Sequence, residues 1–576
     1  MYSGLKLIEL LEKQHQLRSQ SGLFKKDTFT LLWRTKVGSF PHPDLETMVS
    51  AGEPCGAWHI NNGRPEDKRN VGQNWEQLKC LPLNGYIPGS SIRGLVRAWA
   101  KQRPEILPRM NELLGYQNND LISPGKIEFL DAWPSQPTKL TLDIVNPQET
   151  FQIYHEGQGT PLSLYTLGNG EDEITVTVAI RGIPGQVTDD DVQEVWEWVQ
   201  QALGVYGVGS RTASGYGTVE FSRSLKLETD PGYAVKQFEF NLYSQGNAGP
   251  SMTSMELRPS HWRGWLRGWV LRFFLGVMSE DDAQKTVGEL FGTLQPESHK
   301  GCVRVQMFPR QTWCDRSSNQ PSFYQWKGRL QISAPSEILN KVILPIIRFA
   351  VMVGGVGRGW RRPLHIFHMN NGKSAARGTY LTLTHKVKNK TTNNWENKSY
   401  GLPLDTSTWQ KAYSDWRIAV QQLWNDRVLL NNNNITAEVF SPATCAVYVV
   451  PGPDTDPLNS QEKCWEQSRD AEATRGDGMY LIYQQNAPRN YKRNPDLGGN
   501  AAGGGNAHCS WVSIKRVKIP NKQEETDCQE IVCLFMGGQT PNGDRVRSRF
   551  LRDLNNLTGA VHLFGVSAVA AQEPVP

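Results

Sequence analysis

The sequence lacks paired cysteines and long apolar runs. Its nine cysteines are scattered singly along 576 residues, so we expect reduced thiols rather than a disulfide framework. No apolar stretch approaches the roughly 18 residues that a membrane span requires. Near the N-terminus the leucines are interrupted by Lys6, Glu9 and Glu12, which does not fit the continuous apolar core of a signal peptide. We therefore expect a cytoplasmic protein with no membrane partner.

Neither sign of charge dominates, and the common nucleotide motifs are missing. There are 62 Lys and Arg against 57 Asp and Glu, a net charge of +5, which permits an anionic partner without requiring one. No G-x-x-x-x-G-K-[ST] motif occurs. What is abundant is tryptophan, with 19 residues, which indicates large buried surfaces or platforms for stacking.

Three motifs occur twice in the same order along the chain. The pairs are Pro88–Ala100 with Arg258–Val270, Leu113–Asp131 with Leu290–Met307, and Gly207–Gly209 with Gly355–Gly357. Three matches in the same order indicate an internal duplication. The spacing between partners differs among the three pairs, as expected when loop lengths vary.

Each half has the same predicted order of strand, helix, two strands, helix, glycine loop and strand. This β-α-β-β-α-β order is that of the ferredoxin-like fold. The sequence therefore predicts an α+β protein with two tandem ferredoxin-like domains. We expect a helical extension at 1–27, a first domain at 28–234 and a second domain at 235–576.

Local signals place several helix ends. Ser90 or Ser91 is expected to cap the helix that follows Pro88. Thr188 and Asp191 form a capping box before an amphipathic helix. Pro345 lies inside a helical pattern and predicts a kink.

The second half is interrupted by polar and glycine-rich stretches. We expect flexible insertions around 368–435 and 452–508. The apolar runs at Ser510–Ile519 and Glu530–Gly538 are expected to return to the sheet of the second domain.

The glycine-rich segment at Gly204–Phe221 has two interpretations. It follows a helix and precedes a strand, which is the reverse of the dinucleotide fingerprint. One interpretation is a helix C-cap and a turn. The other is a surface that RNA backbone approaches closely, because glycines expose N–H groups and Ser210, Arg211 and Thr212 add polar and cationic contacts.

The two motifs of the first half, "GYIPGSSIRGLVR" and "GVGSRTASGYG", resemble the RAMP superfamily, the RNA-binding subunits of CRISPR effectors. "GKIEFLDAWP" with "LTLDIVNPQETFQIY" is similar to the sixth subunit of type III-B (Cmr) complexes. "MELRPSHWRGWLRGWVLRFF" with "GGVGRGWRRPLHI" resembles the first Cmr subunit. The chain thus looks like a fusion of two RAMP subunits over roughly residues 25–375. The second half departs from the P-G-S-S form, so its helix cap is expected to differ.

The resemblance implies two ferredoxin-like RAMP domains in a structural subunit of a type III effector. Such a subunit binds guide RNA (crRNA), caps or extends the backbone toward the 3′ end of the guide, and helps to hold target RNA. The implied partners are guide RNA, target RNA and other effector subunits, with no cofactor. The expected RNA-binding residues are Ser90, Ser91, Arg93, Arg97, Gly207, Gly209, Ser210, Arg211, Arg263, Arg267, Gly355, Gly357, Arg358, Arg361 and Arg362.

Catalysis stays open as an alternative, although we expect none. Some RAMP subunits cut target RNA with an aspartate after the first strand and a divalent metal such as magnesium. Asp44 is the candidate here, with Asp67 a weaker one, and the equivalent loop of the second half has no aspartate. A guide-processing ribonuclease would use a histidine, for which His365 is a remote candidate. His365 and His368 are also weak candidates for metal ligands.

Overall fold

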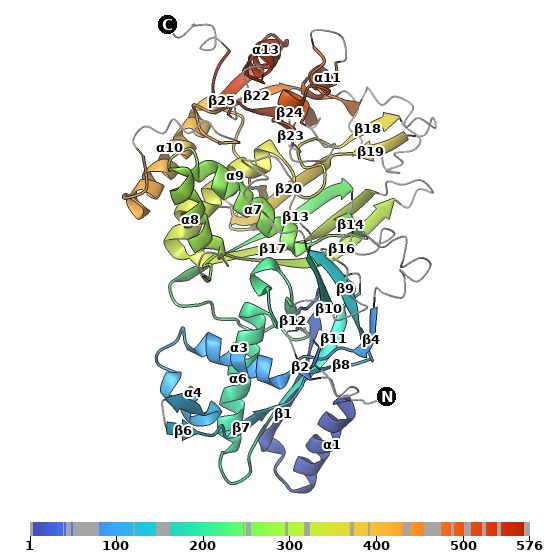
Figure 1. The fold of residues 1–576 in the computed structure, drawn as a ribbon, viewed down its shortest axis with the longest axis vertical. Coiled ribbons are helices and arrows are strands. Elements are labelled where there is room, and N and C mark those ends of the chain that lie inside the picture. The colour runs from blue at the N-terminus through green and yellow to red at the C-terminus, as the bar shows by residue number, and fades with distance from the viewer. Residues whose placement is uncertain are drawn as a thin grey trace.

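The computed structural model describes three antiparallel sheets of four or five strands, arranged one after another along the long axis of the molecule, together with smaller sheets (Figure 1). The described residues are 4–37, 40–41, 48–49, 80–118, 121–145, 162–170, 172–245, 247–248, 255–293, 298–315, 323–368, 374–389, 392–429, 438–453, 474–484, 489–499, 509–520, 526–537 and 543–568. Within these ranges, every helix is too short or too polar to cross a bilayer. The molecule is thus a mixed α/β protein built on several antiparallel sheets.

The first sheet has the strand order β12-β1-β11-β7, with β8 paired to β11. Its strands are β1 (Phe24–Leu31), β7 (Ile127–Phe129), β8 (Trp133–Pro134), β11 (Ile174–Gly182) and β12 (Val219–Phe221). Helices α3 (Gly89–Ala100) and α6 (Asp189–Tyr206) pack against each other and bury one core with this sheet. Helix α1 (Gly4–Leu17) and α4 (Leu107–Leu114) lie at its periphery.

The two helices of the first sheet begin in different ways. Thr188 and Asp191 form the expected capping box on α6, which is confirmed. Neither Ser90 nor Ser91 caps α3, so that prediction is wrong. Pro88 occupies the cap position, and the Gly89 N–H donates to Asp131 Oδ1 at 2.8 Å. A carboxylate from a distant strand end replaces the local serine cap, which the local sequence does not reveal.

The second sheet has the order β16-β17-β13-β20-β21. Its strands are β13 (Tyr233–Gln245), β16 (Arg304–Asp315), β17 (Phe323–Pro335), β20 (Thr379–Lys388) and β21 (Trp395–Ser399). Helices α7 (Pro259–Phe274), α8 (Glu280–Phe291) and α9 (Leu344–Val353) bury a core against it. The kink expected at Pro345 takes the form of a π-helical turn, Ile338–Ile343, that precedes α9. The helix continues from this turn through Pro345, and a π-turn beside a proline is a common way for a helix to accommodate the missing N–H group.

A third sheet has the order β23-β24-β22-β25. Its strands are β22 (Cys445–Pro451), β23 (Val512–Pro520), β24 (Thr526–Phe535) and β25 (Val561–Gly565), with helices α11 (Asp477–Tyr483) and α13 (Gly543–Asn555). The expectation that Ser510–Ile519 and Glu530–Gly538 return to the second sheet is therefore wrong. The second run, in β24, pairs with β22 on one side and with the first run, in β23, on the other, while the second edge of β22 pairs with β25.

The first expected insertion contains ordered structure. Helix α10 (Thr406–Leu423) buries Trp409 and Trp416 in the core of the second sheet, and β21 forms a hairpin with β20. Flexibility is therefore a wrong prediction for these segments. The asparagine run at 431–434 lies outside the described residues.

The remaining elements form smaller sheets and one short helix. They are β2 (Phe40–Pro41) with β3 (Met48–Val49), β4 (Cys80–Asn84) with β9 (Lys139–Val145) and β10 (Leu162–Leu167), β5 (Tyr116–Asn118) with β6 (Leu121–Ser123), β14 (Asn247–Ala248) with β15 (Met255–Glu256), β18 (His365–His368) with β19 (Ser374–Arg377), and α12 (Pro495–Gly498).

The abundant tryptophans stabilise the junction of the second and third sheets. One continuous core contains Trp269 and Phe273 of α7, Trp416 of α10, Phe440, and Phe564 of β25. The rings of Phe273 and Phe440 stack at a centroid distance of 4.7 Å, and those of Phe440 and Phe564 at 5.4 Å. The first sheet has a separate core. The second and third sheets are therefore joined by apolar packing.

Candidate nucleic-acid interface

The first glycine loop is a helix C-cap followed by a tight turn. Gly207 ends α6 with a φ of +75°, and its N–H donates to Leu203 O at 2.8 Å. Val208 N–H then donates to Gly217 O at 2.8 Å, so the two arms of the loop run against each other. A Cβ at Gly217 would clash with Val208 O. The interpretation as a cap and turn is confirmed for these glycines.

The same loop docks onto the second half of the chain. Gly215 lies against Pro259 at the start of α7, where a Cβ would clash with the proline ring. Tyr216 OH donates to Asp143 Oδ2 at 2.5 Å, and Arg258 Nη2 donates to Asp143 Oδ1 at 2.7 Å. Arg34 completes this buried network through an ion pair of 2.8 Å with Glu256. Asp143 thus has a structural role, and the network joins the two halves.

Cations from both halves gather where the loop meets α7. Burial, followed by the charges of Arg267 and Arg211, lowers the pKa of Arg263 to about 10. Burial, followed by the charge of Arg211, lowers the pKa of Lys36. Mutual repulsion of this kind requires cations that lie close together. We call Lys36, Arg211, Arg263 and Arg267 the junction cluster.

Three members of the junction cluster lack a compensating acid among the described residues. Lys36, Arg211 and Arg263 form no ion pair with a carboxylate anywhere in the described ranges. Arg211 is exposed and has a φ of +58°. The left-handed conformation costs a non-glycine residue about 1–2 kcal/mol. Ser210, its neighbour, donates both N–H and Oγ–H to Lys36 O, at 2.8 and 3.3 Å, and Gly209 lies close to the same carbonyl oxygen. Together these contacts hold Arg211 at the surface.

The arginines that recur at the same spacing in the two halves have the same structural role. Arg93 Nη2 donates to Leu114 O at the end of α4, and Arg263 Nη2 donates to Phe291 O at the end of α8. Arg97 Nη1 donates to Gly115 O at 2.5 Å. Each guanidinium group satisfies a helix C-terminal carbonyl group, where positive charge is also favourable. This contact was not predicted from the sequence.

Ser90, Arg93 and Arg97 still share an open surface. They line a groove of about 500 Å³ together with Gly94, Tyr116 and the turn at Ser123–Gly125. Ser91 is half-buried beside them. Burial, followed by the charge of Arg93, lowers the pKa of Arg97. The groove is therefore cationic, although its arginines also support the fold.

The second glycine loop is docked on the third sheet through its arginines. Arg361 is buried, donates to Ser510 O at 2.6 Å and forms an ion pair with Glu438. Arg362 donates to Ser510 Oγ at 2.8 Å. Both therefore have protein partners, which the sequence did not predict. Gly355 and Gly357 shape the turn, and Arg358 is exposed.

A third group of cations surrounds Tyr483 at this docking site. Arg475 Cζ lies 4.6 Å and Lys492 Nζ 4.1 Å from the centroid of the ring. Burial lowers the pKa of Lys492, and nearby arginines lower it further. Sequence analysis missed both residues because they lie in the expected insertion at 452–508. For Lys492 a signal was available in "RNYKRN", a basic run around Tyr491.

The candidate catalytic residues differ in whether the structure describes them. Asp44 and Asp67 lie outside the described residues. His365 is buried, with Nδ1 2.8 Å from Pro363 O and Nε2 3.1 Å from Tyr483 OH. Burial lowers the pKa of His365 to about 3, so its imidazole is neutral and committed to protein contacts. The described part of the chain contains no cluster of three or more potential metal ligands.

Comparison with known proteins identifies part of the chain. Residues 84–220, which include α3, α6 and the first glycine loop, match the model of the RAMP superfamily. We call residues 84–220 the RAMP segment. This RAMP segment contains both motifs of the first-half resemblance, which confirms the superfamily prediction for that half.

Solved structures with similarity to the chain include two Cmr proteins. One is a chain in a cryo-EM structure of the type III-B Cmr-beta bound to cognate target RNA, with a TM-score of 0.25 and 15% identity over 38% of this chain. The match spans 66% of that chain, just under two thirds. The other is Cmr6 from Pyrococcus furiosus, with a TM-score of 0.19 and 19% identity over 35% of this chain and 98% of that one. Both TM-scores are low, so neither likeness by itself establishes a shared fold. No curated protein matches the sequence.

Proposed function

We propose that the chain is a guide-RNA-binding structural subunit of a type III CRISPR ribonucleoprotein effector in the cytoplasm. It caps or extends the backbone toward the 3′ end of the guide and helps to hold target RNA for antiviral defence. The observation that carries this proposal is the junction cluster, in which Lys36, Arg211 and Arg263 have no acidic partner in the described part of the chain. Clustered, uncompensated cations beside glycine N–H groups favour a phosphate backbone.

We further propose that the chain consists of tandem ferredoxin-like RAMP domains, with a boundary near residue 235 that lies just inside β13. The strand orders β12-β1-β11-β7 and β16-β17-β13-β20 support this assignment, because in both the first strand lies between the third and the fourth. The third sheet has the same order, which supports a third unit of this type. The RAMP segment supports the superfamily assignment only for the first unit.

Among the RNA-binding residues expected from the sequence, Arg211 and Arg358 are the sharpest candidates, because both are exposed glycine-loop arginines. We predict that Arg211→Ala and Arg358→Ala each flatten the plot of log affinity against log salt concentration by about 0.7 for single-stranded RNA. The measurement is a salt titration of guide-RNA binding by fluorescence anisotropy. Arg545→Ala, which alters an exposed arginine on α13, is the matched control. Unchanged slopes for both loop variants would contradict the proposal.

The alternative function is metal-dependent cleavage of target RNA through Asp44. Such cleavage needs a carboxylate held beside the scissile phosphate to position the metal ion. We predict that complexes assembled with Asp44→Ala or Asp67→Ala retain every cut in target RNA when magnesium or manganese is supplied. The measurement is mapping of cleavage products on a labelled target. Loss of one cut with Asp44→Ala, while guide binding is unchanged, would instead make the first half a nuclease.

A further inference from the structure

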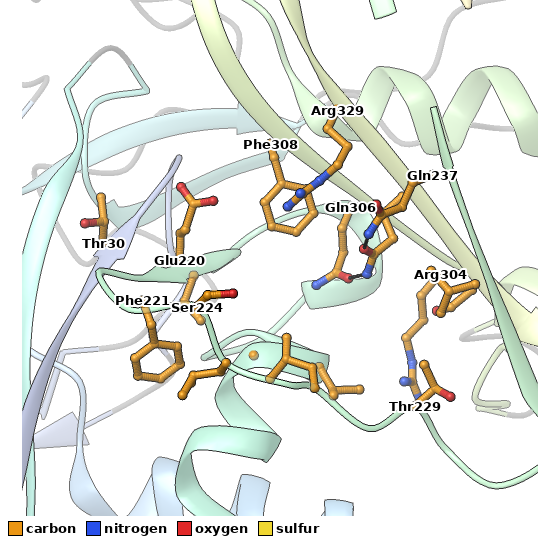
Figure 2. Close-up of a pocket in the computed structure, with 18 of the residues that line it drawn as sticks. Thr30, Glu220, Phe221, Ser224, Thr229, Gln237, Arg304, Gln306, Phe308 and Arg329 are labelled. Atoms are coloured by element: carbon orange, nitrogen blue, oxygen red, sulfur yellow. Dashed lines mark hydrogen bonds between the residues drawn. The ribbon is translucent and has the colours of Figure 1, made fainter. Parts of the chain in front are cut away.

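A cleft of about 810 Å³ separates the first sheet from the second (Figure 2). One wall is the face of the second sheet that is opposite to the helix-covered core. Phe238 and Leu330 point into that core, whereas their neighbours Gln237, Arg329 and Gln331 line the cleft. The other wall comes from β1, β12 and the segment that links the halves. The cleft thus lies outside the junction cluster and contains none of the residues expected to bind RNA.

Three glutamine side chains form a ladder across the strands on this wall. Gln237 Nε2 donates to Gln331 Oε1 at 2.8 Å, and Gln331 Nε2 donates to Gln306 Oε1 at 3.1 Å. The register places Gln331 opposite both partners. Each amide has two N–H groups and two acceptor lone pairs, so the ladder uses only part of its capacity. Amides of this kind hydrogen-bond the edges of nucleobases.

Beside the ladder lies a planar stacking surface. Arg329 Cζ sits 4.3 Å from the centroid of Phe308, its cross-strand partner. Figure 2 shows these two side chains together between Glu220 and the glutamines. Arg329 Nε is buried and lacks a hydrogen-bond partner within the described ranges. Unstacked bases of single-stranded RNA stack on aromatic rings and on guanidinium planes.

Carboxylates offset part of the positive charge of the cleft. Arg304 pairs at 2.7 Å with Asp230, which also pairs with Arg103 at 3.3 Å, and Arg223 pairs with Asp27 at 3.4 Å. Glu220 projects from the opposite wall, where its carboxylate would repel a phosphate group. A carboxylate instead accepts hydrogen bonds from the amino groups of bases.

We propose that this cleft binds an unstacked nucleobase of a single-stranded RNA segment. The base stacks on the Arg329–Phe308 pair and hydrogen-bonds the glutamine ladder, while its phosphates stay outside. This proposal rests on the proposed RNA binding and adds a base-contacting site to it. The cleft would recognise the base of a nucleotide, whereas the cationic surfaces would bind its phosphate.

The test compares two RNA probes of equal length on the full chain. One is a fluorescein-labelled single-stranded dodecamer of mixed sequence, and the other is its abasic counterpart with the same phosphates. We expect Phe308→Leu and Gln331→Leu each to weaken binding of the first probe about tenfold, because loss of a stacked base contact costs about 1–3 kcal/mol and loss of an amide contact to a base edge costs a similar amount, about 1–3 kcal/mol. Binding of the abasic probe should not change. Lys327→Ala, on the same strand but outside the cleft, should leave both affinities unchanged.

The outcomes separate the two proposals. Equal affinities for the cleft variants and the wild type, with Arg211→Ala weakening both probes, would overturn the base site and leave RNA binding intact. Weakening of both probes alike by the cleft variants would also overturn it, because the cleft would then contact phosphate. No effect of Arg211→Ala or Arg358→Ala on either probe would refute the proposed function itself. Matched circular dichroism spectra would establish that the leucine variants are folded.

Discussion

Asp143→Ala is expected to weaken the contact between the first and second halves by about 3–5 kcal/mol, the cost of leaving buried charges uncompensated. The Asp143 carboxylate is fully buried and accepts hydrogen bonds from Arg258 and Tyr216. Arg34 Nε lies 3.8 Å from it. Without this carboxylate, the buried guanidinium groups of Arg34 and Arg258 would share the charge of Glu256, with which each forms an ion pair. The measurement is urea denaturation followed by tryptophan fluorescence, together with limited proteolysis of the segment between β12 and β13.

Two further variants sharpen this test. Glu128→Ala removes a solvent-exposed ion pair with Arg181 and should cost at most about 1 kcal/mol. A double variant, Asp143→Leu with Arg258→Met, replaces part of the charged network by apolar groups and should recover part of the lost stability. Equal denaturation midpoints for Asp143→Ala and Glu128→Ala would show that the network does not hold the halves together.

Glu438→Ala is expected to destabilise the junction of the second and third sheets by about 3–5 kcal/mol. Glu438 accepts hydrogen bonds from Arg272 Nε at 2.9 Å and from Arg361, and all three side chains are buried. Burial lowers the pKa of Arg272, and the charge of Glu438 offsets part of that effect. Removal of the carboxylate leaves two buried cations side by side. The measurement is hydrogen exchange, in which amides of α7 and β23 should lose protection.

The matched control is Glu337→Ala, because Glu337 forms an exposed ion pair with Lys341 one helical turn away. Such pairs contribute about 0.3–0.5 kcal/mol. Unchanged protection in α7 and β23 for Glu438→Ala would contradict a role of this carboxylate in joining the two sheets.

Much of the first half was predictable because its signals are local. The capping box at Thr188, the apolar stripe of α6 and the glycine that ends this helix lie within one stretch of sequence. Helix capping and amphipathic periodicity depend on neighbours within a few residues. The duplication was likewise visible, because its motifs recur in the same order.

The third sheet was missed for a related reason. Its strands β22 and β23 are separated by 60 residues that include polar and glycine-rich stretches, so the pattern resembled an insertion. Strand pairing joins residues that are distant in sequence, and no local signal indicates which sheet an apolar run enters.

The sequence by itself determined the duplicated order of elements, the ends of α6, the turn-forming glycines and the resemblance to the RAMP superfamily. Only the tertiary structure decided which arginines are available to an anion. Arg361 and Arg211 both belong to glycine loops, yet Arg361 is buried against Glu438, which lies 77 residues away, whereas Arg211 stays at the surface. Whether a cation is neutralised depends on which carboxylate the fold brings within a few ångströms, and chain folding over long separations sets that distance.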